Sequence, residues 1–178
     1  MSISNRPARP NRTASEVAKG IKDRVRIQRI HSEPGVPANA RLRGWARLAL
    51  GRRRRAELLI RLVDGPESAD LNETYRHKSG PTNVLAFPFA PPPGVTSRLL
   101  GDLVICVPVL AREAAEQGKP LAHHWAHIVT HGVLHLRGWD HQTPAAAARM
   151  EAKERRLLQR LGIPDPYGAE QPAGPDRA

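Results

Sequence analysis

Residues 131–141 read His-Gly-Val-Leu-His-Leu-Arg-Gly-Trp-Asp-His, with histidines at positions 131, 135 and 141. On a helix, His131 and His135 lie one turn apart on the same face, so both imidazoles can reach one ion. Gly138 can adopt the left-handed conformation that ends a helix, and the returning chain could bring His141 to the same point. Three neutral nitrogens with an open fourth position are typical of a catalytic rather than a structural zinc site. We therefore expect the fold to be organised around a helix that carries a metal centre.

The same stretch matches the zinc-protease pattern H-E-x-x-H-x-x-G-x-x-H at every fixed position except one. The glutamate that serves as general base in those enzymes is replaced by Gly132. The ligand set is therefore kept, whereas the usual peptidase base is missing. Zinc, one ion per chain, is the predicted metal. Nickel, copper and cobalt also accept imidazole ligands, so the identity of the ion stays open.

The composition of the chain indicates which class of molecule it binds. A length of 178 residues indicates one domain of ordinary size with room for a core. The formal net charge of +11 makes polyanions the natural partners. Aromatic residues make up only 4%, too few for a surface that stacks many bases. Affinity for nucleic acid should therefore be directed mostly at phosphates and be sensitive to salt.

Cysteine usage and hydropathy indicate a cytoplasmic protein. Cys106 is the only cysteine, which excludes an internal disulfide and fits a reducing compartment. It lies in the apolar run 103–107, so we expect a buried, inert thiol. No segment approaches the roughly 18 apolar residues that span a bilayer. The basic N-terminus is not followed by the apolar region of a secretory signal.

The chain divides into one domain and two tails. Residues 1–22 combine basic side chains with Pro, Asn and Ser and have little to bury, which predicts a disordered basic tail. This tail is interpreted as a solvated segment or, alternatively, as a weak RNA-binding arm. Residues 23–168 form the predicted single domain, and 169–178, rich in Gly, Pro and Ala, a frayed tail.

Hydrophobic periodicity predicts strands and helices in a mixed order. The expected strands are 25–30, 58–63, 84–89 and 99–107, and the third and fourth can form an antiparallel pair. The expected helices are 38–50, 68–78, 109–117, 121–136 and a last one that starts at Thr143-Pro144 and ends at Gly162.

Each of two groups of basic residues has two possible roles. His124 and His127 precede His131 on the predicted helix. We interpret them as groups that support the ligands or face solvent, because a further ligand would fill the open position. The four arginines 52–55 are either a phosphate-binding run or a solvated loop.

Further stretches stand out as motifs: 71–76 (LNETYR), 81–88 (PTNVLAFP), 100–105 (LGDLVI), 116–121 (EQGKPL) and 162–167 (GIPDPY). Together with residues 131–141 they resemble the YbeY family, the bacterial single-strand-specific endoribonucleases associated with ribosomal RNA maturation. The resemblance covers residues 55–168 and leaves the basic N-terminal segment unexplained. It implies an α+β fold, with a small mixed four-stranded sheet packed with about five helices and a zincin-like metal helix.

The resemblance also assigns roles. It implies that His131, His135 and His141 are the metal ligands and that Arg76 is the other functional residue. The chain departs from the family at three positions, where the family often has Asp, Ser and Tyr: Asn83, Ala86 and Trp139. A role that needs a carboxylate at 83, or a hydroxyl at 86 or 139, is therefore in doubt.

Our hypothesis is metal-assisted cleavage of single-stranded RNA, in ribosomal RNA maturation and ribosome quality control, with the small ribosomal subunit and its proteins as further partners. The planar guanidinium of Arg76 suits two phosphate oxygens. Asp140, next to a ligand, is either the general base or a carboxylate that supports the ligand, and we favour the second role. Two alternatives are a metallopeptidase, opposed by Gly132, and a non-enzymatic ribosome-assembly factor with a structural metal.

Overall fold

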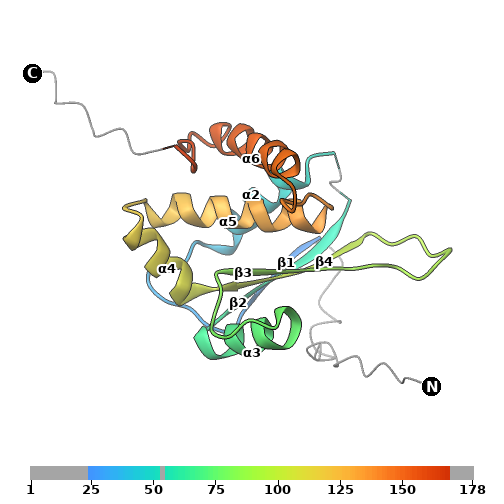
Figure 1. Cartoon of the computed structure of the whole chain (residues 1–178), viewed down its shortest axis with the longest axis horizontal. Helices are drawn as coiled ribbons and strands as arrows, with labels where there is room; N and C mark the ends of the chain where they lie inside the picture. Colours follow the sequence, from blue (N-terminus) through green and yellow to red (C-terminus); the bar gives the residue numbers. More distant parts are fainter. Residues whose placement is uncertain (1–23, 53–54, 169–178) are drawn as a thin grey trace, which may run out of the picture.

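Four strands form one mixed sheet with helices on both faces, in the computed structural model that describes residues 24–52 and 55–168 (Figure 1). The strands are β1 (Val25–Arg29), β2 (Glu57–Val63), β3 (Val84–Pro88) and β4 (Leu99–Cys106). The helices of these residues are α2 (Asn39–Leu50), α3 (Gly65–Arg76), α4 (Val107–Glu116), α5 (Leu121–Leu136) and α6 (Pro144–Gln159). The expected α+β class is confirmed. The predicted tails 1–22 and 169–178 lie outside the described residues, as do positions 53 and 54 of the arginine run.

The sheet has the strand order β1-β2-β4-β3. β1, β2 and β4 run parallel, and β3 pairs antiparallel with β4, which leaves β3 as an edge strand. The register sets Ala86 opposite Leu103 and Phe87 opposite Asp102. The predicted antiparallel pair is therefore confirmed, and the loop that joins its strands extends well beyond the rest of the sheet (Figure 1).

Side chains that alternate along β4 belong to two separate cores. Leu103 and Ile105 pack in the core that includes the buried side chains of α2, α5 and α6. Val104 and Cys106 pack in a smaller core on the other face, where Leu71 of α3 joins them. Helices α5 and α3 therefore cover opposite faces of the sheet, as Figure 1 shows.

Helix α5 is the centre of the larger core. It packs against α2, α4 and α6 and against strands β3 and β4. Its predicted bounds, 121–136, are those of the structure. Trp125, Ile128 and Val129 of the expected apolar stripe are buried. The histidines at positions 124, 127, 131 and 135 lie on another side of the helix than this apolar stripe.

Two helices begin earlier than the sequence indicated. α3 starts at Gly65 rather than Ser68, because Asp64 is its N-cap and accepts the Glu67 backbone N–H over 3.0 Å. α4 starts at Val107 rather than Val109, because Pro108 lies in its first turn, where a missing N–H costs nothing. Both differences shift a boundary without changing an element.

The single cysteine is buried, as predicted. Burial is also the main cause that raises the pKa of the Cys106 thiol, so the thiol stays protonated and unreactive. No helix within residues 24–52 and 55–168 combines the length and the apolar character needed to cross a bilayer.

Candidate metal centre

The three predicted ligands come from the last turns of α5 and from the loop that follows it. His131 and His135 lie one turn apart near the C-terminal end of α5. Gly138, with a φ of 88°, donates its N–H to the His135 carbonyl over 2.9 Å, and Trp139 donates to the Leu134 carbonyl over 3.1 Å. This pair of bonds is a Schellman turn, and it directs the chain back toward the helix.

The returning chain brings the three histidines together. One ring nitrogen from each of His131, His135 and His141 lies within 4.8 Å of the other two. The Nε2 atoms of His131 and His135 are 3.0 Å apart. A tetrahedral zinc with bonds of about 2.0–2.1 Å would hold its ligand nitrogens roughly 3.3 Å apart, so this separation suits one shared ion.

The electrostatics of the cluster also suit a metal. Burial, followed by the neighbouring rings of His131 and His141, lowers the pKa of His135 to about 4. Its imidazole is therefore neutral at pH 7, which is the protonation state that a metal requires. His141 is exposed, whereas His131 and His135 are half-buried, so the cluster has one side open to solvent. The donor set and the neutral ring of His135 therefore fit the predicted zinc ion.

A buried carboxylate that the sequence analysis missed lies directly behind His131. Glu154 of α6 is fully buried, and its Oε1 accepts a hydrogen bond from His131 Nδ1 over 2.8 Å. Its Oε2 accepts from His127 Nε2 over 2.9 Å and from the Tyr167 hydroxyl. A signal was present in the sequence, because Glu154 follows Met150 by one helical turn on the face that Leu157 and Leu158 also line.

These hydrogen bonds decide the charge of the carboxylate. Burial alone would raise the pKa of Glu154, but the bonds from His127, His131 and Tyr167 outweigh it and lower that pKa to about 2. Burial and the same carboxylate raise the pKa of Tyr167, which keeps its hydroxyl protonated as a donor. Glu154 is therefore a charged acceptor of three hydrogen bonds.

Among the described residues, the Asp140 side chain forms no hydrogen bond with His131, His135 or His141. It is exposed, and Oδ1 accepts the backbone N–H of Gln142 over 3.2 Å. The carboxylate behind His131 is Glu154 instead. The supporting role that the sequence analysis favoured for Asp140 thus belongs, in the structure, to a residue of α6.

The two earlier histidines of α5 have different environments. His127 contacts Glu154 and so lies behind the three-histidine cluster, in the supporting position expected for it. His124 is buried, and its Nε2 donates to Glu113 Oε2 over 2.9 Å. The Asn83 amide donates to both oxygens of the same carboxylate, over 3.1 and 3.0 Å. His124 therefore belongs to a polar cluster that joins α4, α5 and the start of β3.

Arg76 lies apart from the three histidines. It is the last residue of α3, its side chain is exposed, and α3 covers the sheet face opposite to α5. Within the described part of the chain, no hydrogen bond or ion pair connects Arg76 to the cluster. The structure thus brings together three of the four predicted site residues.

Gly132, which replaces the protease glutamate, faces the sheet. A Cβ atom on this residue would lie 2.9 Å from Leu103 Cδ2 and 3.4 Å from Val84 Cγ2. Position 132 is therefore part of the contact between α5 and the strands, and a larger side chain there would have to displace the Leu103 side chain.

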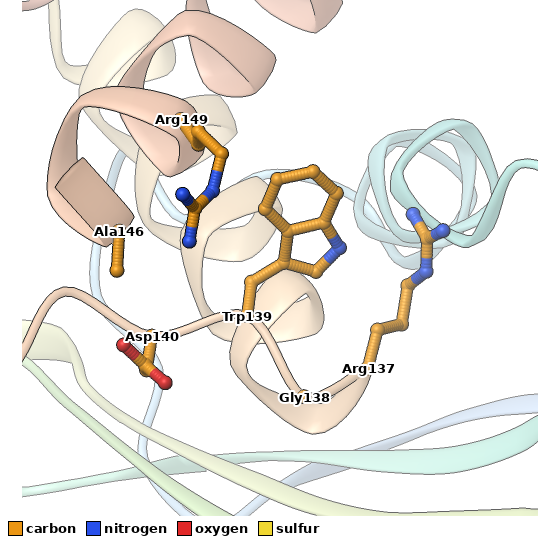
Figure 2. A pocket seen from close by; sticks show the side chains of 6 residues that line it. All are labelled: Arg137, Gly138, Trp139, Asp140, Ala146 and Arg149. Carbon is orange, nitrogen blue, oxygen red and sulfur yellow. The ribbon is translucent and has the colours of Figure 1, made fainter.

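An open hollow adjoins the turn between His135 and His141. Figure 2 shows the Trp139 indole at its centre, with Arg149 of α6 on one side and Arg137 on the other. Gly138, Asp140 and Ala146 complete the lining. The hollow has a volume of about 160 Å³ and presents the exposed guanidinium group of Arg149, whereas Arg137 donates from Nη1 to the Ala49 carbonyl of α2 over 2.6 Å.

The sequence and the fold have clear relatives. Residues 39–162 match the model of a family described as "Endoribonuclease YbeY". A protein of that name from Methylococcus capsulatus is 56% identical over 141 residues, which cover 79% of this chain and 93% of the relative. Another from Halorhodospira halophila is 60% identical over 117 residues, 64% of this chain and 76% of the relative. The solution structure of TM1509 from Thermotoga maritima shares the fold, with a TM-score of 0.53 and 20% identity over 84% of this chain and 99% of that one.

Proposed function

The chain belongs to the YbeY family of endoribonucleases, and on that premise we propose that it is an RNA-cleaving hydrolase whose three clustered histidines hold one zinc ion. The observation that carries the proposal is the convergence of three imidazoles at one solvent-facing point. A zinc ion bound there would polarise a phosphoryl oxygen and lower the pKa of a bound water to about 7.

The residues around the cluster define where a substrate can approach. His141 is exposed, so the open side of the cluster faces solvent. The exposed Arg149 lines the adjoining hollow (Figure 2), where its guanidinium group can pair with a backbone phosphate. We assign the binding of a single RNA strand to this side of the molecule.

Arg76 is proposed as a second phosphate contact, reached around the edge of the sheet. The ring of its neighbour Tyr75 packs on Phe87 of β3, with ring centres 5.0 Å apart. Ala86, next to Phe87 in β3, is paired with Leu103 of β4. The Leu103 side chain points to the other face of the sheet, where it contacts Gly132 of α5.

The end of α3 and the histidine-bearing part of α5 are therefore at the same level of an edge strand, on opposite faces. Since β3 is the edge strand of the sheet within residues 24–52 and 55–168, an extended RNA that crosses this edge can contact both. This supports a role for Arg76 at the substrate phosphate rather than at the metal.

Asp140 is the better of the two nearby carboxylates for exchanging a proton with solvent. Glu154 is fully buried and accepts three hydrogen bonds, whereas Asp140 is exposed one residue before His141. We therefore propose Asp140 as the candidate general base, a role that its position supports and that its replacement by asparagine tests.

We further propose single-stranded ribosomal RNA as the substrate, in rRNA maturation and ribosome quality control in the cytoplasm, with the small ribosomal subunit as the particle on which the protein acts. The formal net charge of +11 supports a polyanionic partner. Peptide hydrolysis lacks support, because the position of the protease base is packed against Leu103.

The decisive experiment combines metal analysis with RNA cleavage by rigorously purified wild-type protein and H135A. We expect one zinc per wild-type chain, cleavage of single-stranded RNA, and loss of both in a folded H135A. Undiminished cleavage by H135A would identify a contaminating nuclease. RNA binding and full cellular rescue by H135A would favour the non-enzymatic assembly role.

A further inference from the structure

Glu154 occupies the position from which a carboxylate can orient a metal ligand. We propose that it is a positioning residue, which fixes the ring of His131 so that Nε2 presents its lone pair to the metal. This inference rests on the proposed function, because it assumes that His131 is a ligand. It assigns to α6 and to the turn after it a part in the metal centre, although neither supplies a ligand.

The geometry selects one form of the imidazole. Nδ1 of His131 lies 2.8 Å from Glu154 Oε1, and a carboxylate oxygen accepts hydrogen bonds, so Nδ1 carries the hydrogen. Nε2 is then left with its lone pair, and it is the atom that lies 3.0 Å from Nε2 of His135. Without an acceptor at Nδ1, the ring could carry its hydrogen on either nitrogen and rotate more freely.

Three donors from two segments hold the carboxylate in place. His127 and His131 reach it from α5, and the Tyr167 hydroxyl reaches it from the turn that follows α6. That turn is anchored in its own right. The Tyr167 backbone N–H donates to Asp165 Oδ1 over 2.9 Å, and Lys119 Nζ donates to the Pro166 carbonyl over 2.8 Å.

The same groups could in principle bind a second ion. One ligand atom each from His127, His131 and Glu154 lies within 4.8 Å of the others. However, Nε2 of His127 is bonded directly to Oε2 of Glu154 over 2.9 Å, and the Tyr167 hydroxyl, which also donates to Oε2, lies 3.3 Å from that nitrogen. An ion at this point would have to replace these contacts. Since the carboxylate already accepts three hydrogen bonds, we infer a supporting network and one ion per chain.

The test compares E154Q and Y167F with the control E116Q. Glu116 is exposed on α4, where it pairs with Arg112, so E116Q makes the same chemical change away from the site. Zinc dissociation constants are measured by competition with a chelator. We expect E154Q to bind zinc about 10- to 100-fold more weakly, Y167F a few-fold more weakly, and E116Q like wild type.

A second readout separates orientation from general loss of structure. In the metal-free protein, ¹⁵N NMR of the histidines should show His131 with its hydrogen on Nδ1 in wild type and a mixture of the two forms in E154Q. Circular dichroism verifies that each variant is folded, and Y167F provides the comparison should E154Q fail to fold.

Three results would overturn the inference. They are unchanged zinc affinity in folded E154Q and Y167F, two zinc ions per wild-type chain with loss of one in E154Q, and a His131 hydrogen on Nε2 in the metal-free wild type. The NMR result does not depend on RNA cleavage. A wild-type protein that binds zinc and shows the Nδ1 form but leaves RNA intact would therefore contradict the proposed function and not the role of Glu154.

Discussion

Gly132 faces Leu103 so closely that a Cβ atom on residue 132 would lie 2.9 Å from Leu103 Cδ2. The residue that replaces the protease base is therefore a packing residue of the contact between α5 and β4. Restoring the protease glutamate by G132E would force a carboxylate into this buried contact, and we expect a loss of about 3 kcal/mol or more in the free energy of unfolding.

The control for G132E is G44E on α2. Gly44 is exposed, and no heavy atom lies within 4 Å of its Cβ position. We expect G44E to keep or slightly raise stability, because glutamate is a better helix former than glycine by about 0.5–1 kcal/mol. Urea unfolding compares the two, and a peptide-library digest should show no peptidase activity in G132E. New peptide cleavage would revive the metallopeptidase alternative.

Replacing Arg76 should affect RNA cleavage without affecting metal binding. R76A removes a guanidinium from the last turn of α3, where its side chain is exposed, so we expect a change in stability within about 0.5 kcal/mol. If Arg76 stabilises charge on the reacting phosphate, cleavage should fall by about 100-fold or more. R76K should recover only part of it, because a lysine cannot form the bidentate contact.

R160A is the matched control for R76A, since Arg160 is also an exposed arginine at a helix end. Single-turnover cleavage and zinc content are measured for both. If R76A and R160A lower the cleavage rate equally, Arg76 contributes only through the net charge and has no specific role at the reacting phosphate.

The turn at Gly138 should couple stability to metal affinity. G138A places a Cβ on a residue with a φ of 88°, which costs about 1–3 kcal/mol for a side-chain-bearing residue. His135 is hydrogen-bonded to the Trp139 backbone in the same turn, and His141 follows it. We expect both lower thermal stability of the metal-free protein and weaker zinc binding by chelator competition. G162A, at the end of α6 with a φ of 70°, should lower stability alone.

The Glu113 cluster predicts a dependence of stability on pH. Burial favours the neutral carboxyl, but the hydrogen bonds from His124 and Asn83, with the nearby charge of Arg112, outweigh it and lower the pKa of Glu113 below its ordinary value of 4.5. A lowered folded-state pKa stabilises the protein above 4.5 and ceases to do so as pH falls through the folded value. We therefore expect E113Q to be less stable than wild type by about 1 kcal/mol at pH 7.

The difference between wild type and E113Q should shrink as the pH falls below 4.5. Urea unfolding of both proteins between pH 3 and 7 measures it, with E116Q as the control, because Glu116 is exposed on the same helix. A difference that stays constant over this range would contradict the lowered pKa of Glu113.

Binding of single-stranded RNA should weaken steeply with salt. Each phosphate that a basic side chain neutralises contributes a slope of about −0.7 to the plot of log affinity against log salt concentration. R149A should reduce the slope by about that amount if Arg149 contacts a phosphate in the hollow around Trp139 (Figure 2). Fluorescence anisotropy with an uncleavable RNA analogue measures both slopes, and identical slopes would exclude Arg149 from the RNA path.

Much of the fold and the core of the site could be predicted from local sequence signals. The 121–136 helix, the turn at Gly138 and the Thr143 N-cap all follow from short-range spacing, and the structure has each of them. The start of α3 was missed because Asp64 directly follows a strand, where a cap is hard to distinguish from the strand end.

Tertiary relationships could not be predicted in the same way. Glu154 is 23 positions from His131, and only the packing of α6 against α5 brings them within 2.8 Å. Similarly, the motif around Arg76 gave no indication that α3 covers the sheet face opposite to α5. A family motif identifies functional residues, whereas their side of the sheet depends on the course of the whole chain.

The Tyr167–Glu154 hydrogen bond makes the surroundings of the histidine cluster depend on the far end of the domain. A chain cut after Asp165 would keep all three histidines and Glu154 but lose the hydroxyl that is the third donor to this carboxylate. The short GIPDPY segment is therefore the boundary to respect when the C-terminus of this protein is shortened or fused to another domain.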